Sequence, residues 1–220
     1  MNPLISPAAS VVILKPGNSG FDILLLKRSS ELSFAPNYWV FAGGKLETFD
    51  FKDGDGEVDA AFHAAKRECL EETGLTVEGL SYLSTWTAPE SAKRRFRTHF
   101  FVATMPVSQE VAVDGSEIVE HLWLPLSEAA DKAMSGQLLM MPPTVVTLVH
   151  LSEQNDPSLL EQFLADRPYL DYATKLIRTE EGIWALLPGD SGWESKDLEL
   201  NNKQHRLLLT QNNQYLYFRS

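Results

Sequence analysis

The sequence has only one cysteine, Cys69, so it can form no intrachain disulfide. A disulfide-stapled secreted scaffold and a cysteine-ligated metal cluster are therefore excluded. It contains no run approaching the ~20 apolar residues that would span a bilayer, and its first residues do not form a basic leader followed by an apolar stretch. Basic side chains are scarce, and the net charge of -11 repels nucleic-acid polymers. We expect a cytoplasmic protein that binds neither membranes nor nucleic-acid polymers.

An α/β pattern runs through the chain. β-rich runs at 11–14 and 22–26 flank a turn at 16–20 and predict a hairpin. A short strand is expected at 38–41 and an acidic surface loop at 47–58. Further strands are predicted at 80–87, 98–104 and 117–125. Ser127 is the expected cap of a short helix, prolines begin another helix at 142–151, and a third opens at 156–157. From 174 onward the pattern returns to strands.

The segment with the strongest chemical signal is a helix expected from Ala60 to Thr73, with Asp59 as its N-cap and Gly74 as its stop. Three carboxylates, those of Glu68, Glu71 and Glu72, follow the i, i+3, i+4 spacing of one helical face. Such a run is usually a solvated acidic face. Alternatively, a hard divalent cation such as Mg²⁺ compensates the repulsion, because it takes oxygen ligands and bridges to phosphates.

The surrounding residues favour the metal. Arg67-Glu68-Cys69-Leu70-Glu71-Glu72-Thr73-Gly74-Leu75 resembles the second half of the Nudix box, and Gly43-Gly44 stands upstream after a strand. The chain is therefore similar to the Nudix hydrolases (MutT-like), and the resemblance implies an α/β Nudix fold with a mixed β-sheet sandwiched between helices. One departure is an insertion of about nine residues before Asp59, so that Asp59 or Glu57 replaces the first glutamate of the box.

The resemblance also implies a chemistry. Glu68 and Glu72, assisted by Glu71 and by the carbonyl of Gly43, are expected to hold Mg²⁺ or Mn²⁺, with Arg67 fixing a carboxylate and Gly44 touching substrate. The general base is open between Glu71 and Glu120. A period of two along 117–124 places Glu120 on the apolar side of its strand, where its pKa would rise; the alternative is an edge glutamate that reaches solvent.

A second resemblance concerns the substrate. Leu24 to Ser29 followed by Phe41 to Gly44 has the spacing of the signature found in coenzyme A-hydrolysing Nudix enzymes, and much of the chain looks most like the Nudix motif 19-like branch. Three positions deviate from that signature: Ser33, Asn37 and Ala42. The branch implies that coenzyme A or acyl-CoA is cut to 3′,5′-ADP and a phosphopantetheine product. Arg28 and Arg95 are candidate phosphate ligands, although each could equally serve the surface or the core.

Other readings stay open. The same chemistry fits ADP-ribose, NADH or a nucleotide sugar, and a catalytically silent nucleotide-binding module is a third alternative. We place the hydrolase domain at 1–155 and a C-terminal α+β extension at 156–220, packed on the same domain. That extension would cover the active site, recognise the pantetheine arm, or form a homodimer interface. Trp39, Trp86 and Trp123 lie on strand-like runs and are expected to be packing residues, with the alternative that one of them faces an adenine.

Overall fold

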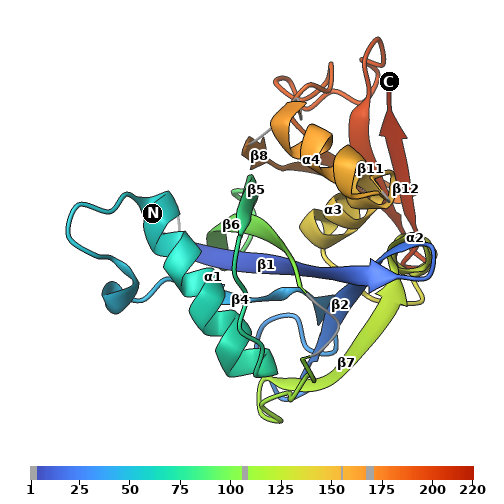
Figure 1. Cartoon of the computed structure of the whole chain (residues 1–220). Coiled ribbons are helices and arrows are strands. Elements are labelled where there is room, and N and C mark those ends of the chain that lie inside the picture. Colours follow the sequence, from blue (N-terminus) through green and yellow to red (C-terminus); the bar gives the residue numbers. More distant parts are fainter. Residues whose placement is uncertain (1–3, 106–108, 155, 167–170) are drawn as a thin grey trace.

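The computed structural model describes residues 4–105, 109–154, 156–166 and 171–220. A mixed sheet of eight strands forms its centre (Figure 1). Its strands are β1 (Ile5–Gly17), β2 (Gly20–Arg28), β3 (Trp39–Val40), β4 (Ala42–Lys45), β5 (Ser81–Thr87), β6 (Arg95–Thr104), β7 (Ile118–Pro125) and β8 (Asp171–Ala173). The predicted hairpin is confirmed: β1 and β2 pair antiparallel, with Gly17 opposite Gly20.

The order of the strands explains how the site is assembled. The sheet runs β3-β2-β1-β6-β5-β8, with β4 also pairing with β1 and β7 with β2. The β1–β6 and β5–β8 pairs are parallel and the others are antiparallel. Because β4 pairs with the first half of β1, Gly43 and Gly44 lie opposite Ser10 and Ala9. This pairing fixes the glycine pair on the rigid centre of the sheet.

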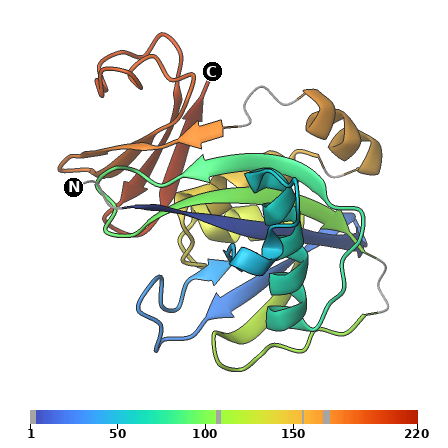
Figure 2. The same ribbon diagram turned by 90° about the vertical axis from the view of Figure 1, so that its left-hand side faces the viewer.

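Helices cover both faces of the sheet, as Figure 2 shows from the side. α1 (Glu57–Thr73) packs its alanines and Cys69 on one face, against Val11, Ile13 and Phe101. α2 (Leu126–Met134) and α3 (Pro142–Ser152) cover the other face and share a core with β5 and β6. The predicted mixed sheet between helices is thus confirmed.

The C-terminal segment adds α4 (Pro157–Asp166) and a second, antiparallel sheet ordered β12-β11-β10-β9. The strands of that sheet are β9 (Lys175–Arg178), β10 (Gly182–Leu186), β11 (His205–Thr210) and β12 (Tyr215–Arg219). Its long β10–β11 connection is held by Arg206, which binds Asp190 through two nitrogens (2.6 and 2.7 Å) and also donates to two backbone carbonyls. Leu207 and Tyr215 of this sheet belong to the same core as α3 and β5. The C-terminal segment therefore packs on the main sheet and its helices.

Three predicted boundaries were wrong. α1 begins at Glu57 and its N-cap is Gly56; Asp59 lies inside the first turn, where it accepts a hydrogen bond from the Gly56 N–H (3.1 Å). Ser127 does not cap α2, because the helix begins at Leu126, directly after β7, and its N-cap is Pro125. The acidic loop contains a short 3-10 helix, η1 (Thr48–Asp50). The C-terminal stop at Gly74 was correct, with its φ of 70° in the left-handed region.

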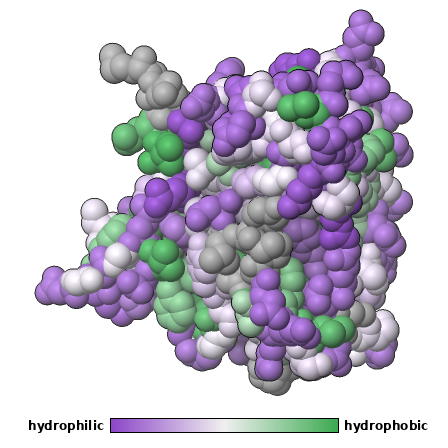
Figure 3. Space-filling model, turned by 90° about the horizontal axis from the view of Figure 1, so that it is seen from above, coloured by the Kyte–Doolittle hydropathy of each residue, from purple (hydrophilic) through white to green (hydrophobic). Residues whose placement is uncertain are grey.

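Within the described residues, no helix has both the length and the apolar character needed to cross a membrane. Hydrophilic side chains dominate the face drawn in Figure 3, and the hydrophobic ones there are scattered.

Candidate active site

The C-terminal half of α1 brings two carboxylates to the glycine pair of β4. Glu72 is buried, and its Oε2 accepts a hydrogen bond from the backbone N–H of Gly43 (2.9 Å). Glu68, one turn earlier, packs so tightly over Gly44 that a Cβ atom there would lie 2.4 Å from its Oε1. Gly44 therefore has a steric reason: it leaves room for the carboxylate of Glu68 beside the strand.

Arg67 holds the outer part of this cluster. Its Nη1 donates to Glu68 (2.7 Å) and to Glu71 (3.0 Å). Its Nε and Nη2 form a two-pronged contact with Asp50 (3.1 and 2.9 Å), whose side chain is only 3% exposed. Arg67 also donates to the Lys45 carbonyl. The predicted role of Arg67 in positioning a carboxylate has this geometric basis.

Asp50 is a site residue that the sequence analysis missed. Glu57 and Asp59, the two candidates for the first acidic position of the box, are used elsewhere: Glu57 contacts His99 and Arg97 of β6, and Asp59 caps the helix start. The partner of Arg67 comes instead from inside the insertion. Although burial alone would raise the pKa of Asp50, the hydrogen bonds from Arg67 and from the Glu47 N–H hold it below the ordinary value.

Burial makes the two inner carboxylates costly to ionise. It raises the pKa of Glu72 to about 8, against the opposing hydrogen bond from Gly43, and the neighbouring Glu68 raises it further. Burial also raises the pKa of Glu68, while Arg67 opposes the shift. Paired carboxylates with raised pKa values mark a place where a cation would be strongly stabilised. Cys69 is no participant, because burial raises the pKa of its thiol to about 11.

The donor set fits a hard divalent cation, but its side chains are not gathered around one point. Glu71 is 57% exposed and turns outward to Arg67. Among the described residues, no group of three or more His, Cys, Asp or Glu side chains is arranged to enclose a metal ion. Glu68 and Glu72 supply the oxygen ligands that Mg²⁺ or Mn²⁺ prefers, and Glu71 would have to release Arg67 to join them. The fit therefore rests on the two inner glutamates.

A cavity of about 740 Å³ opens beside these carboxylates. Its lining includes Glu68, Gly43 and Gly44, together with Ala8 and Ser10 of β1. Its other walls are largely apolar and come from Phe34, Phe41, Phe96, Phe100, Trp86 and Pro142. The volume lies in the range typical of small-molecule sites.

The cationic side chains near the cavity differ partly from the predicted pair. Arg28 lines the cavity, donates to the Phe34 carbonyl (3.3 Å) and acts electrostatically on Glu72. Arg95 does not line it; its guanidinium turns to the Ala88 carbonyl (3.4 Å). The neighbouring Arg94, which is exposed, lines the cavity instead. The basic loop therefore contributes Arg94, rather than the predicted Arg95, to the lining of the cavity, because β6 begins at Arg95.

The placement of Glu120 on the apolar side of its strand was wrong, and the alternative, a glutamate that reaches solvent, is confirmed. Its side chain is 48% exposed and pairs with Lys27 (2.9 Å). A register shift between Lys27 and Arg28 interrupts the β2–β7 ladder here, so the alternation of faces does not carry through from Ile118 to Leu122. Glu117, immediately before β7, lines the cavity and acts electrostatically on both Glu68 and Glu72. No sequence periodicity pointed to it, because it lies outside the strand.

One deviation from the coenzyme A signature has a conformational explanation. Asn37 stands where that signature has glycine, and it adopts the left-handed conformation with φ of 63°. Asparagine tolerates this region better than other side chains, so the turn before β3 is kept. The loop that carries Phe34 against the cavity therefore retains its geometry.

Sequence comparison decides the family. The model of the NUDIX domain matches residues 5–142. The chain belongs to the NUDIX hydrolase family. The matched segment contains the main sheet as far as β7, the carboxylate helix and the cavity walls up to Pro142. The predicted hydrolase is thereby confirmed, whereas the domain boundary at 155 stays a prediction.

Curated relatives agree with this assignment. A nudix hydrolase of Caenorhabditis elegans is 29% identical over 209 residues, covering 76% of this chain and 68% of its own. The acyl-coenzyme A diphosphatase NUDT19 of Xenopus laevis is 21% identical over 287 residues, covering 86% and 75%. The Homo sapiens protein of the same name is 29% identical over 112 residues, which span 49% of this chain and 30% of that protein.

Solved structures share the fold. A NUDIX hydrolase from Alicyclobacillus acidocaldarius has a TM-score of 0.67 at 20% identity and covers 76% of this chain and 98% of its own. The NUDIX domain of Shewanella oneidensis NrtR, solved with ADP ribose, has a TM-score of 0.53 at 16% identity, with 68% and 88% covered. At such identities the likeness concerns the fold alone.

Proposed function

We propose that this protein hydrolyses the diphosphate bond of coenzyme A or acyl-CoA, giving 3′,5′-ADP and a phosphopantetheine derivative, with Mg²⁺ or Mn²⁺ as its cofactor. The observation that carries the proposal is the cavity itself, whose lining combines Glu68 and Glu117 with a large share of apolar side chains. A substrate with a diphosphate at its centre and a long, uncharged arm matches this combination. The relatives named acyl-coenzyme A diphosphatases support the same substrate class.

The glutamates and the arginines of the site would have different roles, which follow from where each lies. Glu68 and Glu72, with Glu71 after it releases Arg67, would hold the cation, which supplies charge neutralisation at the diphosphate and at the leaving phosphate. Arg28 lies close enough to Glu72 to influence its charge and would contact a phosphate on the same side. Arg94 borders the cavity from the loop before β6 and offers a second cation for the 3′-phosphate.

Glu117 is the carboxylate we assign to proton transfer. It faces the cavity near Glu68 and is exposed to water, so it can accept a proton from an attacking water and return it to solvent. Glu120 lies only three residues further on but is engaged by Lys27. The two glutamates therefore form a matched pair for testing the assignment.

The test is turnover of coenzyme A, acetyl-CoA, ADP-ribose and NADH by the purified protein with Mg²⁺ or Mn²⁺, followed by identification of products. Coenzyme A compounds should be the best substrates and yield 3′,5′-ADP, and Glu72→Gln should lower kcat by about 10²-fold or more. Glu117→Gln should lower kcat by at least about tenfold, with Glu120→Gln within about twofold of wild type. Preference for ADP-ribose or NADH would contradict the substrate; equal loss in the two glutamine variants would contradict the base.

A further inference from the structure

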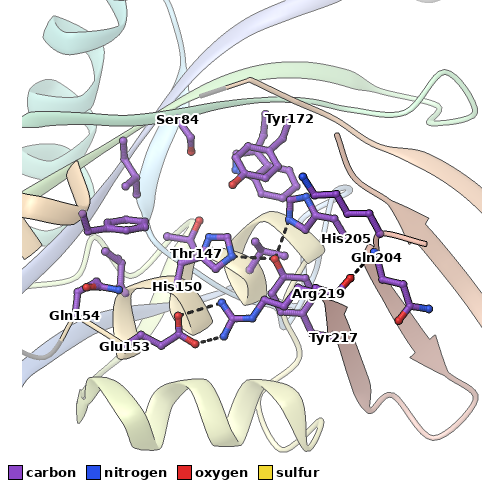
Figure 4. A pocket seen from close by; sticks show the side chains of 17 residues that line it. Ser84, Thr147, His150, Glu153, Gln154, Tyr172, Gln204, His205, Tyr217 and Arg219 are labelled. Carbon is purple, nitrogen blue, oxygen red and sulfur yellow. Dashed lines mark hydrogen bonds and ion pairs between the residues drawn. The ribbon is translucent and has the colours of Figure 1, made fainter. Parts of the chain in front are cut away.

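A second cavity, of about 520 Å³, lies where the C-terminal extension meets the hydrolase core. Figure 4 shows its lining: Ser84 of β5, Thr147 and His150 of α3, Tyr172 of β8, and His205 and Tyr217 of the second sheet all face the same space. Most of its surface is apolar, and residues such as Leu83, Val146 and Phe163 contribute to it. Nothing in the proposed chemistry at Glu68 and Glu72 uses it.

This cavity and the catalytic cavity share their walls. The first turn of α3, with Pro142 and Thr144, borders the catalytic cavity, while Thr147 and His150, further along the same helix, border the second one. Trp86 of β5 borders both. The two spaces are therefore neighbours along one face of the sheet, with Trp86 at their boundary.

Trp86, at the boundary of the two cavities, has a closely stacked ring but an unpaired N–H group. Its ring stacks on Tyr172 with centroids 4.2 Å apart and planes 5° from parallel, and it is 3% exposed. Its indole N–H is nevertheless buried without a hydrogen-bond acceptor among the described residues. A buried donor left unpaired costs about 1–3 kcal/mol, so a ligand carbonyl that displaced the atoms covering this nitrogen would be stabilised. The boundary of the cavities thus carries an unused donor.

His150 supplies a matching acceptor. Nδ1 of His205 donates to the Pro188 carbonyl (2.6 Å), so in the neutral ring its Nε2 accepts the Tyr217 hydroxyl proton (2.9 Å). The Tyr217 oxygen then accepts from Nε2 of His150 (2.8 Å), which leaves Nδ1 of His150 without a proton. That nitrogen is an acceptor on a cavity-lining side chain, and no hydrogen bond to it is recorded among the described residues.

We infer that the second cavity receives the far end of the substrate's uncharged arm, beyond the part that lies along the apolar walls of the catalytic cavity; the arm is an apolar chain interrupted by amide groups, whose carbonyl and N–H are met by the indole of Trp86 and by His150. The inference rests on the proposed function for the identity of the arm. Charged groups sit at the rim, where Arg219 binds Glu153, so the interior suits a neutral chain. An occupied cavity would make acyl-arm selection a property of the C-terminal extension.

The experiment compares Thr147→Phe, which adds a ring to the cavity, with Thr147→Val, which keeps its volume. For acyl-CoA, KM should rise by about tenfold or more in the first variant and stay near wild type in the second, while inhibition by 3′,5′-ADP, which has no arm, is the same in both. Trp86→Phe should raise KM for acyl-CoA severalfold while leaving inhibition by 3′,5′-ADP unchanged; it should also lower the unfolding midpoint, because the smaller ring leaves a void beside Tyr172. A merely structural role would lower that midpoint and leave the KM for acyl-CoA unchanged.

Calorimetric titration with pantetheine separates this inference from the proposed function. Binding to wild type, weakened about tenfold or more by Thr147→Phe, supports the arm site even if coenzyme A is not cleaved. If coenzyme A is cleaved but pantetheine does not bind and Thr147→Phe leaves the KM for acyl-CoA unchanged, the arm site is overturned and the proposed function stands.

Discussion

Glycines 43 and 44 are adjacent in sequence, but a side chain would meet different obstacles at each. A Cβ on Gly44 would come within 2.4 to 2.7 Å of the carboxylate of Glu68, the mobile end of a side chain. A Cβ on Gly43 would come within 2.3 Å of the Ala9 carbonyl oxygen and 2.7 Å of the Ser10 Cα, which are backbone of β1. A side chain at position 44 would therefore displace the carboxylate of Glu68, whereas a side chain at position 43 would disturb the pairing of β4 with β1.

We expect Gly44→Ala to fold normally and to lose about 10²-fold in kcat/KM, because a displacement of order 1 Å at a catalytic group has that cost. Gly43→Ala should lose about 1–3 kcal/mol of unfolding free energy, since packed backbone cannot move aside cheaply. Steady-state kinetics and urea unfolding on both variants make the comparison. Full activity in Gly44→Ala would show that Glu68 does not need its present place.

At the scale of elements, the insertion between β4 and α1 is an integral part of the site. It projects from the molecule in Figure 1, yet η1 returns Asp50 to the buried side of Arg67. Through Arg67 this one carboxylate reaches Glu68 and Glu71.

Asp50→Asn keeps the shape of this side chain and removes its charge. We expect a loss of about 2 kcal/mol in unfolding free energy, as for a hydrogen bond between charged groups. We also expect kcat to fall about tenfold while KM changes little, because Arg67 then swings more freely between its glutamates. Asp53→Asn, at an exposed position in the same insertion, is the control and should behave as wild type. If Asp50→Asn lost stability alone, Asp50 would be a purely structural anchor.

The sequence predicted elements well wherever a local pattern decides them. The β1–β2 hairpin, the stop at Gly74 and the prolines that open α3 follow from turn chemistry and capping, which act within a few residues. Positions that depend on long-range pairing were missed. The irregularity in β7 between Ile118 and Glu120 turns Glu120 to the exposed side. The start of β6 at Arg95 leaves Arg94, not Arg95, beside the cavity. Asp50 binds Arg67, which is 17 positions away in the sequence. A period of two or of 3.6 contains none of this information.

On the scale of the whole molecule, the extension and the core meet around uncharged histidines. Burial lowers the pKa of His150 to about 4, and Arg219 and His205 add to this shift. Burial also lowers the pKa of His205. Both rings bind the hydroxyl of Tyr217, so the junction is built on neutral imidazoles.

This junction predicts how stability depends on pH. The unfolded chain protonates His150 near the ordinary pKa of 6.5, whereas the folded protein keeps it neutral down to about 4. Stability is therefore fully present above pH 6.5, falls as the pH drops through this window, and loses at most about 3 kcal/mol from this residue. The downward shift of His205 acts in the same direction. Urea unfolding at intervals from pH 7.5 to 4 measures the slope.

His150→Gln isolates the contribution of this residue, because glutamine still offers a hydrogen-bond donor near Tyr217 and does not titrate. The variant should be less stable than wild type at pH 7.5 if it loses ring packing, and the gap should narrow as the pH falls, since only the wild type pays the cost of keeping an imidazole neutral. Other titrating groups are common to both proteins and cancel in the difference. Parallel stability curves would mean that His150 is free to protonate in the folded state and that the junction opens in mild acid.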